Sequence, residues 1–155
     1  MAEREAISKY ASGEYFFEIK EAYLSGSPHY LSDGTSLFSA LESAISKSTL
    51  KHDTKLFRAL RVDSSWVDSL ADGSIIDHKF FISTTTNNSQ ATSYGVAKKV
   101  RGQKPVLLEI LAPAGTNASP GMTAIQEVIL SPDTKMRVRS VKNLGKNTLV
   151  TVDIV

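Results

Sequence analysis

The spacing of apolar residues divides the chain into a helical first third and a strand-rich remainder. In residues 16–23 apolar side chains recur at the i, i+3, i+7 spacing of a buried helical stripe, and the run Gly26–Pro28 ends it. Residues 37–45 repeat that spacing after the capping-type run Ser32–Thr35. The pattern predicts two packed helices.

From residue 55 onward apolar and polar side chains alternate, as they do in half-buried strands. The elements expected next are a strand over 55–62, a short helix around Trp66, a strand over 79–86, a helix over about 89–100 and a strand over 105–111. After them we expect an apolar strand that starts at Val128, breaks at Ser131–Asp133 and resumes through Val138, and a last strand over 148–155. Helices first and strands afterwards predict an α+β fold, with N-terminal helices packed on a mostly antiparallel β core.

Length and composition narrow the class of protein. At 155 residues with a net charge of +2, we expect one domain spanning residues 1–155 and a monomer. The absence of cysteine excludes disulfides, a thiol nucleophile and cysteine-bound zinc. The apolar runs are too short to span a bilayer and the N-terminus lacks the apolar core of a signal peptide, so we expect a soluble, cytoplasmic protein. Acidic and basic residues are interspersed, which points away from a membrane partner and disfavours nucleic acid without excluding it.

The three histidines, His29, His52 and His78, are scattered along the chain without the spacing of metal ligands. Structural and catalytic zinc sites need at least three protein ligands brought together. We therefore expect these histidines on the surface and no metal site.

Three polar features stand at expected strand ends: Arg58, the hydroxyl run Ser83-Thr84-Thr85, and Glu127. Each has an ordinary explanation, because an arginine in a strand often pairs with an acid, threonine favours strands, and a glutamate that opens a strand is usually solvated. Glu127 follows the turn-rich loop Ala118–Ala124, and a carboxylate on the rigid end of a strand beside a loop can be aimed at a substrate.

Taken together in this order, the three features resemble a known family. Arg58 in an aromatic-Arg strand, then Phe81-Ile82-Ser83-Thr84-Thr85, then Glu127 leading a Val-Ile-Leu strand is similar to the arginine–serine–glutamate class of mono-ADP-ribosyltransferases, which includes the enzymatic components of bacterial binary toxins and phage-encoded transferases. The likeness covers nearly the whole chain. It implies a two-sheet β core with an NAD cleft at the strand ends.

The resemblance assigns catalytic roles to Arg58, Ser83 and Glu127. The leaving group in NAD is already cationic, so its departure needs no general acid, and one carboxylate near the oxocarbenium-like sugar can suffice. Glu127 would accept a hydrogen bond from the ribose 2′-hydroxyl, and Ser83 would hold that carboxylate in place. Arg58 would clamp the pyrophosphate with its forked donors.

The same resemblance implies further contacts with NAD as co-substrate. Besides the three catalytic residues, the residues expected to touch NAD are Ala59, Thr84, Thr85 and Tyr94. Tyr94 would pack against nicotinamide, with ordinary core burial as the equal alternative. No Gly-x-Gly-x-x-Gly follows any expected strand, so NAD would lie in a cleft rather than on a glycine turn.

The acceptor loop departs from the family pattern. The expected acceptor-facing residues are Met122, Thr123, Ile125 and Gln126. Ile125 stands where the family has its first glutamate, and an isoleucine accepts neither a hydrogen bond nor a proton, so arginine is disfavoured as the acceptor. If the segment is extended, the Gln126 side chain should point to the face opposite Glu127.

These residues favour an NAD-dependent ADP-ribosyltransferase that modifies a macromolecule, preferably a protein, docked by the loop Ala118–Ala124. A toxin-like NAD glycohydrolase is the second hypothesis, because loss of the first glutamate leaves the NAD-cleaving residues in place. The third is a degenerate domain that binds NAD or a partner without catalysis. It is motivated by Ile125 and by Ala59, which stands where the family commonly has a glycine after the arginine. The acceptor, the organism and the route of delivery are not fixed by the sequence.

Overall fold

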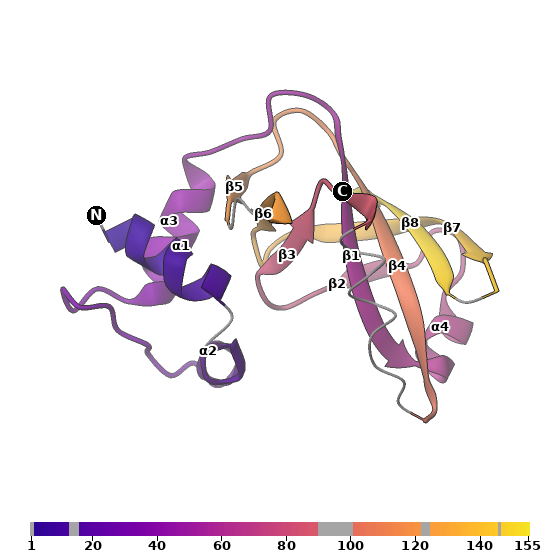
Figure 1. The fold of residues 1–155 in the computed structure, drawn as a ribbon, viewed down its shortest axis with the longest axis horizontal. Helices are drawn as coiled ribbons and strands as arrows, with labels where there is room; N and C mark the ends of the chain where they lie inside the picture. The colour runs from indigo at the N-terminus through magenta and orange to yellow at the C-terminus, as the bar shows by residue number, and fades with distance from the viewer. Residues whose placement is uncertain (1, 13–15, 90–100, 122–124, 146) are drawn as a thin grey trace.

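The computed structural model describes residues 2–12, 16–89, 101–121, 125–145 and 147–155 (Figure 1). The helices are α1 (Ala2–Ser12), α2 (Phe16–Ser25), α3 (Leu37–Ser46) and α4 (Ser64–Ser69). The strands are β1 (Thr54–Asp63), β2 (Ile75–Asp77), β3 (Ile82–Thr85), β4 (Gln103–Ala112), β5 (Ala118–Pro120), β6 (Glu127–Leu130), β7 (Lys135–Asn143) and β8 (Thr148–Ile154). Figure 1 shows α1 to α3 at one end, β1, β4, β7 and β8 at the other, and β3, β5 and β6 between them.

The strands follow the hydrogen-bonded order β2-β7-β8-β4-β1-β3-β6-β5. Every neighbouring pair is antiparallel except β4 with β8. β1 and β4 pair along their whole lengths, whereas β1 and β3 are joined by the single pair Phe57 with Thr85 within the described chain. The sheet therefore consists of two halves that meet at one residue pair, and the predicted α+β, mostly antiparallel fold is confirmed.

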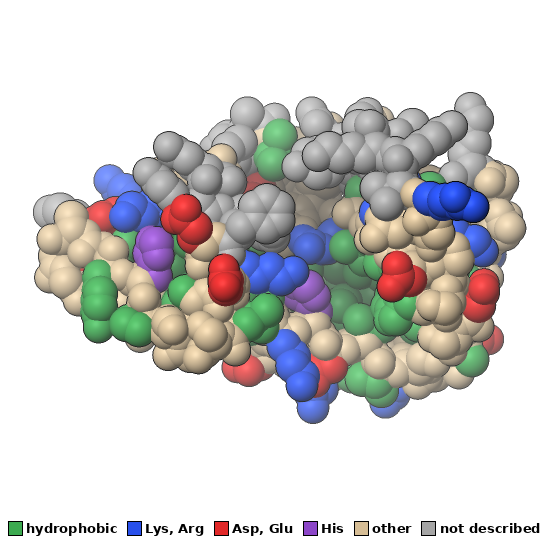
Figure 2. Space-filling model, turned by 90° about the horizontal axis from the view of Figure 1, so that it is seen from below, with side chains coloured by type: hydrophobic (Ala, Val, Ile, Leu, Met, Phe, Trp, Pro, Cys, Tyr) green, Lys and Arg blue, Asp and Glu red, His purple; other side chains and the backbone are tan. Residues whose placement is uncertain are grey.

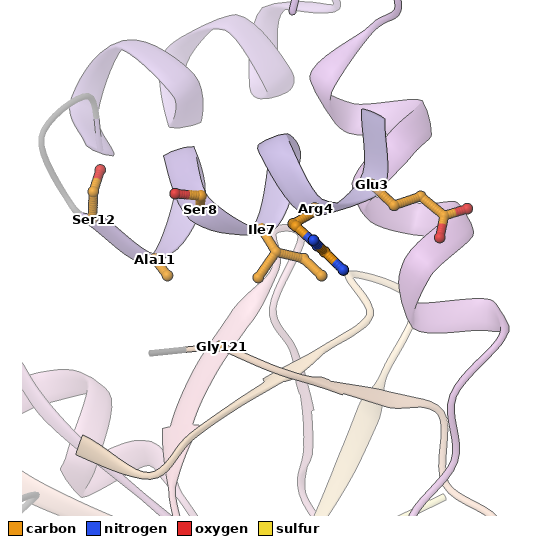
Figure 3. Close-up of a pocket in the computed structure, with 7 residues that line it drawn as sticks. All are labelled: Glu3, Arg4, Ile7, Ser8, Ala11, Ser12 and Gly121. Carbon is orange, nitrogen blue, oxygen red and sulfur yellow. The ribbon is translucent and has the colours of Figure 1, made fainter. Parts of the chain in front are cut away.

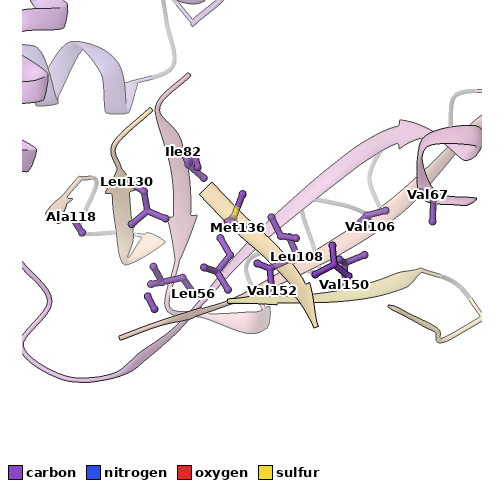
Figure 4. Close-up of a cluster of buried hydrophobic side chains, with 13 residues drawn as sticks. Leu56, Val67, Ile82, Val106, Leu108, Ala118, Leu130, Met136, Val150 and Val152 are labelled. Carbon is purple, nitrogen blue, oxygen red and sulfur yellow. The ribbon is translucent and has the colours of Figure 1, made fainter. Parts of the chain in front are cut away.

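The smaller half of the sheet consists of β3, β6 and β5. A hydrophobic core lies on each side of it. The first lies between the two halves (Figure 4) and contains Leu56, Ile82, Leu108, Leu130, Val150 and Val152. The second lies under the helices and contains Tyr10, Ile19, Leu41, Phe80, Phe81 and Ile129. Successive side chains of a strand point to opposite faces, so β6 supplies Leu130 to the first core and Ile129 to the second. The β3–β6 pair is thereby held from both sides.

The local structure differs from the sequence expectation in four places. Helix α1 was not predicted, and it buries only Ala6 and Tyr10, a stripe too sparse to stand out in the sequence. Strand β2 was also missed. The expected loop around Ser119 forms β5, whose proline is tolerated because β5 lies at the sheet edge. Strand β3 begins at Ile82, not Lys79, because Phe80 and Phe81 belong to the helical core.

The expected helix over 89–100 lies mostly outside the described residues, and Asn88 and Ser89 form its described start. The described helices are short, with eleven residues in α1 and ten in each of α2 and α3. None of the helices in the described ranges combines the length and the apolar content that crossing a bilayer requires.

Candidate functional site

Glu127 is the first residue of β6, as the sequence predicted, and it pairs with Thr85 of β3. Further along the same ladder Ser83 pairs with Ile129. Residues directly opposite each other, and residues two apart on one strand, share a face of the sheet. Ser83, Thr85 and Glu127 therefore share the face of Ile129, which packs under the helices.

Arg58 reaches the same strand from β1. It follows the buried Leu56 by two residues, and its Nη1 donates a hydrogen bond to the carbonyl oxygen of Ser83 at 3.0 Å. Burial lowers the pKa of the Arg58 guanidinium from its ordinary value, although an arginine stays charged at neutral pH. No carboxylate forms an ion pair with Arg58 in the described ranges, so a largely buried cation stands without a counter-ion.

The Ser83 hydroxyl has a partner that the sequence did not reveal. Its Oγ donates to the hydroxyl of Tyr10 at 2.8 Å, and the Tyr10 hydroxyl donates in turn to the carbonyl oxygen of Phe81 at 3.3 Å. The expected hydrogen bond from Ser83 to Glu127 is therefore not the one formed here. The only signal for Tyr10 in the sequence is its spacing of four residues from Ala6, the other buried residue of α1.

The Glu127 side chain is enclosed, with 9% of the residue's surface exposed. On one side it meets the backbone of Gly121, whose N–H donates to the Glu127 carbonyl oxygen at 3.0 Å. A Cβ placed on Gly121 would lie 2.8 Å from the Glu127 carboxyl carbon, closer than side chains pack. The turn before β6 can lie against this carboxylate because residue 121 has no side chain.

The hydroxyls of Thr84 and Thr85 hold the start of β6 rather than facing an opening. Both residues are buried. Thr84 Oγ1 donates to the carbonyl oxygen of Val128 at 2.7 Å, and Thr85 Oγ1 donates to that of Ile125 at 2.6 Å. Since these bonds fall on either side of Glu127, they fix the backbone from which its carboxylate projects.

The acceptor-loop residues that the structure describes do not form an extended segment. Gln126 has a φ of 51°, so the expected alternation of faces does not apply, and its side chain is exposed. Ile125 is half-buried and precedes this left-handed turn. Met122, Thr123 and Tyr94 lie outside the described residues.

The expectation that all three histidines lie on the surface is wrong for His78. His52 is exposed, whereas His29 and His78 are half-buried, and the Nε2 atom of His78 is buried with no hydrogen-bond partner among the described residues. Burial lowers the pKa of His78 to about 4, and the positive charges of Arg58 and Lys20 add to this effect. His78 therefore lies near Arg58 and is neutral at pH 7. The sequence showed only an isolated polar residue at this position.

The surface of the molecule is hollowed in places. Figure 2 shows a recess near the middle of one face, with Lys, Arg and His side chains beside it. A pocket lies between α1 and Gly121, which follows β5 (Figure 3), and is lined by Glu3, Arg4, Ile7, Ser8, Ala11 and Ser12 together with Gly121. Gly121 lines this pocket and also packs against Glu127, so the pocket adjoins the site without containing its residues.

The charged side chains of the arrangement are a guanidinium and a carboxylate. Arg58 offers a cation that has no ion-pair partner among the described residues, and Glu127 offers a carboxylate on the neighbouring strand pair. The described residues contain no group of three His, Cys, Asp or Glu side chains able to hold a metal. Ala59 follows Arg58 in β1, is half-buried and pairs with Leu107 of β4.

Known structures with the same arrangement of strands and helices are ADP-ribosyltransferases. The Vis toxin from Vibrio splendidus, an ADP-ribosyltransferase, superimposes with a TM-score of 0.73 at 21% identity, over 99% of this chain and 72% of Vis. The chain has the ADP-ribosyltransferase fold. C3stau2 from S. aureus, solved with NAD, shares that fold with a TM-score of 0.69 at 19% identity, over 99% of this chain and 86% of its own.

Exoenzyme S from Pseudomonas aeruginosa, solved with human 14-3-3 protein beta and carba-NAD, also has the ADP-ribosyltransferase fold. It matches with a TM-score of 0.71 at 16% identity, over 98% of this chain and 72% of its own. No protein-family model matches the sequence, and no curated protein matches it. The likeness to these proteins is therefore one of fold.

Proposed function

We propose that this protein is an NAD-dependent ADP-ribosyltransferase that moves ADP-ribose to a macromolecular acceptor, preferably a protein, and releases nicotinamide. The observation that carries the proposal is the convergence of three side chains on one strand pair. Arg58 is hydrogen-bonded to the Ser83 backbone, and Glu127 lies on the same face as the Ser83 side chain. These are the three residues to which the sequence assigned catalysis.

The residues fit NAD as co-substrate. A buried guanidinium with no ion-pair partner among the described residues suits the pyrophosphate, because Arg presents several donors in a fork that matches phosphate oxygens. Glu127, enclosed and held at the start of β6, suits a ribose hydroxyl. C3stau2 was solved with NAD and exoenzyme S with carba-NAD, which supports the same co-substrate here.

In the proposed reaction the bond between the ribose C1′ and the nicotinamide nitrogen breaks, and its electron pair leaves with nicotinamide. Glu127 stabilises the positive charge that develops on the ribose, and Arg58 holds the pyrophosphate so that C1′ stays beside the carboxylate. A lone pair of the acceptor then bonds to C1′, and the acceptor atom loses its proton to solvent. Enclosure of Glu127 strengthens this electrostatic effect, because little water screens it.

The acceptor is proposed to be something other than an arginine side chain. Vis was solved with agmatine and exoenzyme S with a 14-3-3 protein, so acceptors and partners vary across this fold. Here the half-buried Ile125 precedes the exposed Gln126 in the turn before Glu127. An isoleucine cannot bind a guanidinium as the family's first glutamate would. A neutral acceptor would not need the negative charge of that glutamate.

The decisive experiment compares Glu127→Gln and Glu127→Ala with wild type, using nicotinamide release from NAD and transfer of label from NAD to proteins of a cell lysate. Both variants should lose about 100- to 1000-fold in rate, the range for removal of one preorganised electrostatic group. His52→Gln, at an exposed position, should behave as wild type. Undiminished NAD cleavage by the Glu127 variants would refute the proposal.

NAD glycohydrolysis is the second candidate function. It is favoured by Ile125, since a site without the acceptor-binding glutamate could pass the ribose to water. Nicotinamide release at the same rate with and without lysate, and with no labelled protein, would select hydrolysis over transfer. Saturable NAD binding with no nicotinamide release would instead select a degenerate binding domain.

A further inference from the structure

Tyr10 is buried in the wall of the candidate site, although it comes from a helix that no sequence motif marks. It is 5% exposed and belongs to the helical core. Its ring lies 5.8 Å from that of Phe81 in an edge-to-face arrangement and 6.1 Å from that of Phe80. These contacts fix the ring, and with it the direction of the hydroxyl.

The Tyr10 hydroxyl stands in a chain of two hydrogen bonds. It accepts from Ser83 Oγ at 2.8 Å and donates to the Phe81 carbonyl oxygen at 3.3 Å. Because its one hydrogen goes to Phe81, its oxygen is left to accept from Ser83. The single hydrogen of Ser83 is thereby directed toward α1, and the Ser83 lone pairs are directed elsewhere.

The hydroxyl also lies close to both charged residues of the site. Burial raises the pKa of Tyr10, while the hydrogen bond from Ser83 and the charge of Arg58 lower it and the charge of Glu127 raises it. Tyr10 therefore stays protonated at neutral pH and acts as a neutral dipole near the cation and the carboxylate. A dipole held in this position costs no reorganisation when charge develops nearby.

We propose that Tyr10 is a positioning residue of the active site, which sets the orientation of the Ser83 hydroxyl and through it the placement of NAD. The inference rests on the proposed function and extends it to a residue 73 positions before Ser83. Tyr10 has no direct role in bond cleavage. It acts on the reaction through Ser83.

A double-mutant cycle on nicotinamide release tests this. Tyr10→Phe keeps the ring and removes only the hydroxyl, so we expect kcat to fall roughly three- to ten-fold, the effect of one net hydrogen bond. In a Ser83→Ala background the same substitution should change kcat by less than about two-fold, because the partner is already gone. Packing alone would give equal effects in both backgrounds.

Tyr23 provides the matched control. Its ring lies 5.5 Å from the rings of both Phe80 and Phe81, and its hydroxyl makes no hydrogen bond to the described residues. Tyr23→Phe should therefore leave kcat unchanged. If Tyr10→Phe does not fold, 3-fluorotyrosine at position 10 replaces it. That residue keeps the hydroxyl but weakens it as an acceptor, and should lower kcat with Ser83 present and not in Ser83→Ala.

The outcomes separate this inference from the proposed function. Suppose that Glu127→Ala loses NAD cleavage. If Tyr10→Phe then has equal effects in both backgrounds, or no effect in either, the role of Tyr10 alone is overturned. Full NAD cleavage by Glu127→Ala would overturn the proposed function, whatever Tyr10 does. A coupled loss at Tyr10 and Ser83, with Tyr23→Phe unchanged, would support the inference.

Discussion

Gly121 determines how closely the turn before β6 can approach the Glu127 carboxylate. The backbone of Gly121 is not in the left-handed region, so an alanine there would meet no dihedral strain. The conflict is one of space, because the new Cβ would lie 2.8 Å from the Glu127 carboxyl carbon and 3.0 Å from its Cγ. Either the turn or the carboxylate would have to move.

We expect Gly121→Ala to lower the free energy of unfolding by about 1–3 kcal/mol, the usual cost of overpacking. In a Glu127→Ala background the cost should largely disappear, since the crowded atoms are absent. Urea denaturation of the four proteins measures both effects. An equal loss in the two backgrounds would show that Gly121 matters for some reason other than its contact with Glu127.

The sequence led to Arg58, Ser83 and Glu127 because each stands in a short motif that resembles one of the family's. The expected place at a strand end holds for Glu127, whereas Arg58 lies in the middle of β1. Tyr10, Gly121 and His78 could not be found in that way. Tyr10 meets Ser83 across 73 positions of the chain. The crowding at Gly121 depends on where the Glu127 side chain points, and the burial of His78 depends on packing around it.

Among the elements, the segment that leads into β3 anchors the helices to the sheet. Phe80 and Phe81 are fully buried, and their rings contact Tyr10 of α1 and Tyr23 of α2. The next residue, Ile82, faces the other core. The strand predicted to start at Lys79 therefore starts only at Ile82, because Phe80 and Phe81 both pack into the helical core.

Phe81→Ala should lower the free energy of unfolding by about 3–5 kcal/mol, since it empties a site enclosed by aromatic rings. Tyr30→Ala removes an aromatic side chain that is 61% exposed and should change stability by less than about 0.5 kcal/mol. Chemical denaturation compares the two variants. Similar losses at both positions would argue against an anchoring role for Phe81.

Elements with strong periodicity were predicted well, and elements held by their neighbours were not. Helix α3 buries five residues at helical spacing, and β1 is a long strand of ten residues that pairs with β4 along its whole length. By contrast, β5 has three residues and exists as a strand because β6 lies beside it. A segment that short carries no periodic signal of its own.

For the molecule as a whole, His78 links folding to pH. Unfolded, it takes up a proton near its ordinary pKa of 6.5, but folded only near a pKa of about 4. Below pH 6.5 the unfolded chain therefore binds the proton more readily, and stability falls as the pH drops toward 4. The slope is at most about 1.4 kcal/mol per pH unit.

Urea denaturation at about pH 7.5 and pH 5 should show a larger loss of stability in wild type than in His78→Gln. The difference between the two proteins isolates His78 from other groups that titrate in this range. His52→Gln, at an exposed position, should follow wild type. Parallel pH profiles for wild type and His78→Gln would mean that His78 charges as easily in the folded protein as in the unfolded one.

The fold class could be predicted because strand alternation and helix spacing are local. The junction of the two sheet halves could not, since the pairing of Phe57 with Thr85 follows from how the strands twist apart in space. That junction is placed directly beside the site. Arg58 follows Phe57 in the chain, and Glu127 pairs with Thr85.

In a molecule joined in this way, a pivot between the two sheet halves would lie beside the candidate site. Any change in the angle between the halves would swing the distal ends, α1 to α3 on one side and β7 and β8 on the other, through long arcs (Figure 1). Groups next to the pivot would travel very little. The outer rims could thus adjust to acceptors of different sizes while the guanidinium and the carboxylate keep their separation.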